Sequence, residues 1–208
     1  GNPIDAQAIT VNTENVHLDL RIRRVKEVAL KVNVVYGGGV APENVGVSLD
    51  YETIRVSGGE AVLDSLGDEI VIGTINMAEL ERSQDVAFPI TLPEGVTNET
   101  GITEVIASVR LVGVNTREMS VSNIQIQNVP EGMEVDLITK KLTVIVRGPT
   151  GMLSNLTEED IFATVDFADA EEGSSTFKAK IAFTDAFDKM GAVGTYSVSA
   201  TVKAVAEE

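Results

Sequence analysis

The chain has 208 residues, no cysteine, a single histidine and a formal net charge of −16. Its length fits two domains of ordinary size, and the absence of cysteine excludes disulfides, thiolate metal sites and a cysteine nucleophile. The acidic charge argues against nucleic acid or anionic lipid as partners, because phosphate groups are repelled by carboxylates. No apolar run reaches the roughly 18 residues of a membrane-spanning helix, so we expect no direct membrane contact from these residues.

Alternating apolar and polar residues predict β-strands along most of the chain, and β-branched residues with few aromatics suit such strands. The fold class that follows is mainly β. In chain order the predicted strands cover residues 16–22, 30–34, 45–49, 54–56, 86–92, 105–112, 124–126, 135–137, 144–146, 177–183 and 196–202.

The chain contains the same pattern twice, about 90 residues apart. This period is too long for a solenoid repeat and suits a small domain with its own core. We therefore expect a strand region at residues 1–25 that belongs to, or is shared with, a preceding repeat, then one repeat at 26–113 and another at 114–208. The recurring residues are Thr53, Val56, Gly58, Leu63 and Leu66, and then Thr143, Val146, Gly148, Leu153 and Leu156.

A short helix is predicted after Gly58 and after Gly148. The apolar residues that follow are spaced to place one face on the sheet, so Leu63, Leu66, Leu153 and Leu156 are expected to be buried. A further helical turn is expected near residues 77–81 and 167–171. The same 90-residue spacing matches Val45 with Val135, so we expect the strands that contain these two residues to be equivalent.

These recurring residues resemble the YbbR-like domain family. The signature Thr-x-x-Val-x-Gly-x-x-x-x-Leu-x-x-Leu is followed in both copies by a strand of the form Thr-apolar-Asn/Asp-apolar, at residues 74–77 and 164–167. The Pro-Glu-Gly turns at 93–95 and 130–132 are also similar to that family. The resemblance spans about residues 26–205, and it departs at Gly59, where the family commonly has proline after glycine.

The resemblance implies tandem elongated β-rich domains, each with one or two short helices, outside the cell behind an N-terminal membrane anchor that is absent from this sequence. In many Gram-positive bacteria a protein of this type regulates a membrane-bound diadenylate cyclase, the enzyme that makes cyclic di-AMP. The implied partner is thus a protein, possibly that cyclase, at the extracytoplasmic face of a bacterial membrane. The family transfers no catalytic residues.

Three kinds of feature could carry chemistry: the single histidine, a run of glycines and three acidic clusters. His17 stands on the polar face of an alternating strand, where a solvent-facing role is expected. No Gly-Lys-Ser/Thr follows Gly37, Gly38 and Gly39, so a flexible hairpin loop is expected there rather than a phosphate site. The acidic clusters at residues 158–160, 169–172 and 185–188 lack the spacing of a calcium loop. We expect no catalytic, cofactor-binding or metal-binding residues, and no cofactor.

Two functions remain open from sequence, and a third, an acidic hydrolase, is disfavoured because the chain lacks a catalytic constellation. The first is a non-enzymatic regulatory or scaffold module that acts by protein contact. The second is a cell-surface adhesion or spacer repeat, which differs from the first in what it would bind rather than in its fold.

Overall fold

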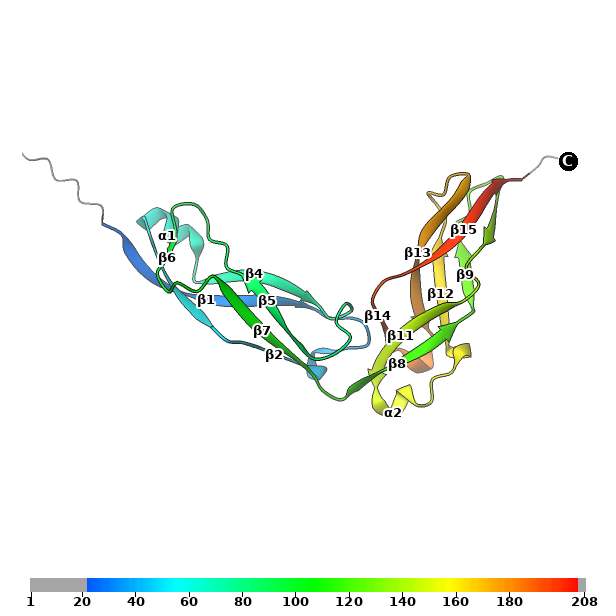
Figure 1. Ribbon diagram of the computed structural model, residues 1–208, viewed down its shortest axis with the longest axis horizontal. Coiled ribbons are helices and arrows are strands. Elements are labelled where there is room, and N and C mark those ends of the chain that lie inside the picture. The colour runs from blue at the N-terminus through cyan, green and yellow to red at the C-terminus, as the bar shows by residue number, and fades with distance from the viewer. Residues whose placement is uncertain (1–21, 206–208) are drawn as a thin grey trace, which may run out of the picture.

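The computed structural model describes residues 22–205 and confirms a mainly β fold. Two elongated β-rich bodies meet end to end at an angle, and the described chain begins and ends at opposite extremes of the molecule (Figure 1). The expected strand at 16–22 and His17 lie outside the described residues, except for Ile22 itself. The first strand, β1, begins at Arg24, two residues before the start expected for the first repeat.

The first repeat consists of two sheets and a short helix. One sheet has the order β4-β1-β3-β6 and the other has the order β2-β7-β5. The helix α1 (Glu60–Leu66) follows Gly59, as predicted. The strands are β1 (Arg24–Val35), β2 (Val45–Leu49), β3 (Thr53–Gly58), β4 (Glu69–Asn76), β5 (Gln84–Pro89), β6 (Thr97–Asn98) and β7 (Glu104–Leu111), with a 3-10 turn η2 at Pro42–Asn44.

The second repeat also consists of two sheets, in the orders β14-β11-β8 and β10-β15-β13-β12-β9. Its helix α2 (Thr150–Leu153) is a single turn with Pro149 as its N-cap. The strands are β8 (Val114–Val121), β9 (Ile124–Gln127), β10 (Met133–Leu137), β11 (Leu142–Pro149), β12 (Ile161–Asp166), β13 (Gly173–Phe183), β14 (Gly191–Val193) and β15 (Tyr196–Ala204), with 3-10 turns η3 (Glu158–Asp160) and η4 (Asp185–Phe187).

Strand pairing shows that the two repeats are built alike around their first strands. In the first repeat, β1 is continuous: its first half pairs antiparallel with β3 and its second half pairs parallel with β4. In the second repeat the same two roles fall to separate strands, since β8 pairs with β11 and β9 pairs with β12. The repeats differ in two ways: β12 pairs with β13 in the second repeat, whereas β4 and β5 belong to different sheets of the first. The interruption at Ser122 and Asn123 also leaves part of β8 without a strand partner on one side among the described residues.

The cores are built from the strand faces that alternation predicted. The second repeat has one contiguous apolar cluster that includes Leu153 and Leu156, whereas the first has two smaller clusters, one of which is centred on Leu63. Leu63 is fully buried, and Leu153 and Leu156 are nearly so. The expectation for Leu66 was wrong in degree: its side chain is only partly buried, because α1 ends at this residue and Leu66 lies at the edge of the cluster.

The predicted alignment of Val45 with Val135 was also wrong. Asp50 N donates to Ile106 O in the first repeat, and Ile138 N donates to Ser199 O in the second. Because these two bonds are equivalent, β2 and β10 correspond with a shift of two residues from the predicted alignment. Val45 of the first repeat therefore corresponds to Met133 of the second, and not to Val135. An apolar residue at every second position looks the same after a slip of two, which is why the sequence pattern did not detect it.

Both Pro-Glu-Gly segments form tight turns. Val96 N donates to Pro93 O at 3.2 Å, and Met133 N donates to Pro130 O at 3.1 Å. The third residue of each turn, Gly95 or Gly132, has a positive φ of 86° or 76°. Glycine adopts this backbone conformation without the steric cost that a Cβ imposes, as a type II turn requires.

Candidate functional site

The signature residues lie in two separate places, one in each repeat, and the structure does not bring them together. Gly58 lies against the first-repeat helix: a Cβ there would be 3.0 Å from Gly95 O and 3.3 Å from Leu63 Cδ2. Gly148 holds the equivalent place, where a Cβ would collide with the Met190 sulfur. Both glycines therefore permit close packing at the strand end before the helix, and their leucines build the cores.

The most unusual side chain in the described chain is Arg147 at the end of β11, which is 1% exposed. Its guanidinium reaches out of the second repeat and donates only to main-chain oxygens of the first. Nε donates to Gly38 O at 2.8 Å, and Nη2 donates to Met77 O at 2.5 Å and to Gly37 O at 3.4 Å. Nη1 donates to Leu80 O. We call Arg147 with these four carbonyls the Arg147 clamp.

The electrostatics of the clamp depend on dipoles. Among residues 22–205, no carboxylate lies within ion-pair distance of Arg147. Burial lowers the pKa of the Arg147 guanidinium, which nevertheless stays protonated as arginine does in proteins. Four carbonyl oxygens arranged around a planar donor can stabilise that charge, because hydrogen bonds with one ionised partner are stronger than neutral ones.

The glycine loop at residues 37–39 completes this contact. It connects β1, through the turn η2, to β2. Since β1 and β2 belong to different sheets, the hairpin expected from sequence is not present. A Cβ on Gly38 would lie 2.9 Å from Arg147 Nη2 and 3.1 Å from Ala192 O. A Cβ on Gly39 would collide with Arg147 O, and one on Gly191 would collide with Gly39 N. The loop is packed against the second repeat, and glycine is what permits so close an approach.

Two further groups secure the junction. Gly194 N donates to Ala78 O of the first repeat at 2.7 Å. Behind Arg147, the Tyr196 hydroxyl accepts from Ile145 N at 2.8 Å and donates to Val193 O at 2.5 Å, so it ties β11 to β14. Burial raises the pKa of Tyr196, the Ile145 N–H opposes that rise, and the charge of Glu81 adds to it. The strands that carry the clamp are thereby held to one another.

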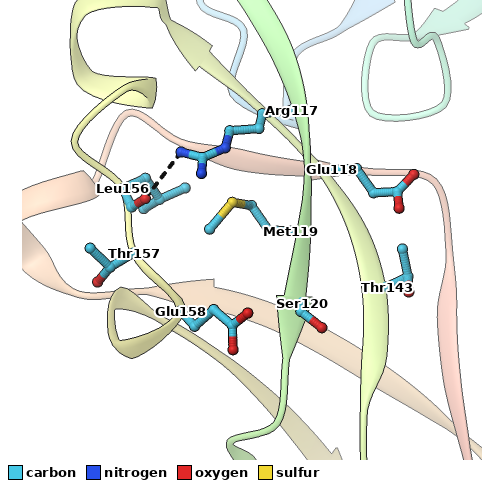
Figure 2. A pocket seen from close by; sticks show the side chains of 8 residues that line it. All are labelled: Arg117, Glu118, Met119, Ser120, Thr143, Leu156, Thr157 and Glu158. Carbon is cyan, nitrogen blue, oxygen red and sulfur yellow. Dashed lines mark hydrogen bonds between the residues drawn. The ribbon is translucent and has the colours of Figure 1, made fainter.

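The second surface is an open groove of about 470 Å³ along β8, lined by Arg117, Glu118, Met119, Ser120, Thr143, Leu156, Thr157 and Glu158. Figure 2 shows Arg117 reaching across it toward Leu156, with Glu158 further along the opposite wall. Arg117 Nη1 donates to Leu153 O and Leu156 O at 3.4 and 3.3 Å. We call this the β8 groove. Sequence reasoning missed both arginines, since neither belongs to a recognised motif.

The acidic clusters form local turns. Asp160 accepts from Thr157 N at 2.9 Å and from Thr157 Oγ1 at 2.6 Å, and these bonds lower the pKa of the Asp160 carboxyl. Within the part of the chain that the structure describes, no three His, Asp or Glu side chains are arranged to hold a metal ion. No helix of residues 22–205 is long and apolar enough to cross a membrane.

Comparison with known proteins gives structural likenesses only. No family model and no curated protein matches the chain. Three solved structures do. A solution structure from Streptococcus thermophilus is 18% identical and covers 46% of this chain and 91% of its own, with a TM-score of 0.35. The YbbR-like domain of a Listeria monocytogenes protein is 16% identical and covers 45% and 98%, also with a TM-score of 0.35.

The third likeness extends over both repeats. A YbbR-like protein from Streptococcus pneumoniae is 12% identical and covers 91% of this chain and 100% of its own, with a TM-score of 0.31. At such TM-scores none of the three carries an argument about function. Two of the three solved structures that the chain is similar to are described as YbbR-like, the family that its repeated motif resembles.

Proposed function

We propose that this chain is a non-enzymatic regulatory or scaffold module that acts by protein–protein contact at the extracytoplasmic face of a bacterial membrane. Its proposed target is a membrane-bound diadenylate cyclase, and its effect is a change in cyclic di-AMP output. The membrane anchor would be supplied by a segment outside this sequence. The partner, its location and the target are taken from the family resemblance. The support from the structure is the contact that joins the two repeats.

The observation that carries the proposal is the Arg147 clamp. Two repeats joined by a flexible linker would move independently, and a partner that contacts both would have to order them on binding. Here a buried guanidinium, four carbonyls and interlocked glycines hold the repeats as one body. A preorganised surface that spans two domains suits holding a partner in place, because less freedom is lost when the complex forms.

Anchoring explains how modest contacts could suffice. A module tethered beside its target meets it at a high effective concentration, so the complex can form without strong intrinsic affinity. The net charge of −16 keeps such a module from adhering to anionic headgroups and favours contact with protein instead.

The test is reconstitution with and without the tether. This chain would be fused behind a transmembrane helix and co-expressed with a membrane-bound diadenylate cyclase, and cellular cyclic di-AMP would be measured. The unanchored chain at matched abundance is the first control, and the anchor alone is the second. We expect the nucleotide level to change with the anchored chain and to stay at its basal value with both controls.

An unchanged nucleotide level in all three strains would contradict the regulatory function. The adhesion or spacer function would then be favoured, because a rigid tandem array serves a spacer equally well. Purified chain that hydrolyses or transfers any phosphoryl, acyl or glycosyl test substrate would contradict the non-enzymatic part on its own.

A further inference from the structure

The β8 groove contains an uncovered strand edge. β8 is the outermost strand of the β14-β11-β8 sheet, so one of its edges pairs with β11 and the other faces the groove. Across the groove stands the segment 156–158, which is not a strand. A strand edge presents main-chain donors and acceptors that can pair with a further strand, unless something covers them.

The first repeat shows what covers the equivalent edge. There β1 pairs in parallel with the start of β4, in the register Ala29 with Glu69, Leu30 with Ile70 and Lys31 with Val71. In the second repeat the corresponding pairing begins only at Ile124 with Ala163, after the interruption between β8 and β9. The segment that would continue it toward β8 forms η3 instead. The last residues of β8 thus lack the parallel strand that covers their counterparts.

The donor left open can be named. Ala29 pairs with Thr53 in the first repeat, and Ser120 pairs with Thr143 at the same place in the second. Ala29 N donates away from β3, to Asp68 O at 2.9 Å. The equivalent donor, Ser120 N, therefore points into the groove, and among residues 22–205 we find no acceptor for it.

Charge at the groove follows the same comparison. Lys26 and Arg117 occupy equivalent positions, since each lies opposite the Val of the signature, Val56 or Val146. Lys26 Nζ lies 2.8 Å from an Asp68 carboxylate oxygen and donates to Gly67 O at 2.7 Å.

In the second repeat Arg117 donates to different carbonyls, Leu153 O at 3.4 Å and Leu156 O at 3.3 Å, and no carboxylate of the described chain lies within ion-pair distance of it. Glu158, at the position of Asp68, lies apart from the guanidinium (Figure 2). In the first repeat, by contrast, a carboxylate next to the covering strand, that of Asp68, meets the equivalent cation.

We propose that the β8 groove binds an extended segment of a partner protein by strand addition. The segment runs parallel to β8, accepts from Ser120 N through its main chain, and places an acidic side chain against Arg117. Main-chain pairing supplies affinity in this mode and the flanking side-chain contacts supply specificity. The inference rests on the proposed protein-binding function and names the chemistry of the partner.

The probe is a peptide copied from the strand that covers the edge in the first repeat, residues 67–76 (GDEIVIGTIN). The full chain, labelled with ¹⁵N, would be titrated with the monomeric peptide and its amide shifts followed by NMR. We expect the largest shifts at Glu118, Ser120 and Val121. Exchange of the Ser120 amide should slow when the peptide is bound. A peptide with Lys at the place of Asp68 should bind about tenfold more weakly, because it places like charges together.

Two variants separate main-chain pairing from side-chain effects. Ser120→Pro removes the open N–H on an edge strand, where proline is tolerated, and should weaken binding about tenfold or more. Ser120→Ala keeps the N–H and should bind as the parent does. Thermal melting would verify that both variants fold; if Ser120→Pro does not fold, protection of the Ser120 amide in the parent chain decides the matter.

No binding at millimolar peptide, or shifts confined to surfaces away from β8, would overturn strand addition. So would equal binding of the Asp and Lys peptides combined with an unprotected Ser120 amide. Either result leaves the cyclase experiment intact. Conversely, if the peptide binds but cyclic di-AMP does not change, strand addition at the β8 groove would be supported and the cyclase would be rejected as the target.

Discussion

A buried arginine with no carboxylate partner is an unusual way to join two domains. Removing a charged group from water costs free energy, and the usual remedy is an opposite charge nearby. Arg147 instead donates four hydrogen bonds to main-chain oxygens of the neighbouring repeat, which belong to the glycine loop and to the segment after β4. Because the acceptors are main-chain dipoles, the contact has direction and planarity that a lysine could not reproduce.

The repeated leucines give a test of burial at the level of single residues. Leu63→Ala should lower the free energy of unfolding by about 2–5 kcal/mol, because the side chain is fully buried and its loss leaves a cavity. Leu66→Ala is the matched control on the same helix. It should cost only about 1–2 kcal/mol, since part of Leu66 is already in contact with water. Urea unfolding monitored by circular dichroism would measure both, and equal losses would contradict the burial described here.

Tyr196 predicts a loss of stability in alkaline solution. Burial raises the pKa of its hydroxyl above the ordinary value of 10.0, so the folded chain holds this proton more tightly than the unfolded chain does. The resulting contribution is complete below pH 10.0 and is lost as the pH rises from there through the pKa of the folded state. Urea midpoints should therefore fall on the alkaline side more steeply in the parent than in Tyr196→Phe. Identical pH profiles of the two proteins would show that the pKa of this hydroxyl is not raised in the folded state.

At the scale of elements, alanine substitutions at Gly39 and Gly67 distinguish the cost of backbone strain from the cost of a steric collision between the repeats. Gly39 and Gly67 have φ values of 75° and 74°, and Gly67 combines this φ with a ψ of −168°, a conformation that is essentially restricted to glycine. A Cβ at Gly67 would meet nothing within 4 Å, whereas one at Gly39 would collide with the main chain of Arg147. We expect Gly67→Ala to cost about 1–3 kcal/mol from its backbone conformation alone. Gly39→Ala should cost clearly more in thermal or urea unfolding, because the collision with Arg147 is added to the cost of a positive φ.

Sequence patterns predicted the type of most elements because alternation and the signature report local burial. They placed the short helices after Gly58 and Gly148 and the strands that form each core. They missed β8 as a strand, because its residues Asn115 to Glu118 are polar and exposed on both faces. They also missed the short strands β6 and β14, which pair over two or three residues and leave almost no period to read.

The candidate sites were beyond sequence reasoning for a different reason. Arg147 follows Val146 on a strand, where a charged residue ordinarily faces water. Only the approach of the first repeat buries it. The β8 groove exists because the second repeat breaks a strand that the first keeps whole, and no local pattern marks the missing partner. Both features depend on contacts between segments far apart in the chain, which single-residue preferences do not encode.

For the whole molecule, Arg147→Ala should uncouple the repeats without unfolding either one. Several hydrogen bonds from a charged donor are lost, so the free energy that couples the repeats should fall by about 3 kcal/mol or more. Small-angle scattering should show a broader distribution of sizes, and calorimetry should show two transitions in place of one. Arg55→Ala, which truncates an exposed arginine on β3, is the control and should change neither. A single transition and an unchanged scattering profile in Arg147→Ala would mean that the glycine contacts suffice alone.

The chemistry of the Arg147 clamp also determines which positions can change in sequence without loss of the contact. One side of the contact is an arginine, and the other side is made only of peptide carbonyls, so the side chains of Met77 and Leu80 do not take part in recognising it. Substitutions at those two positions can accumulate while the joint keeps its geometry. Pairwise co-variation between positions would then fail to report one of the closest contacts in the protein, and the only imprint on the first repeat would be a requirement for glycine.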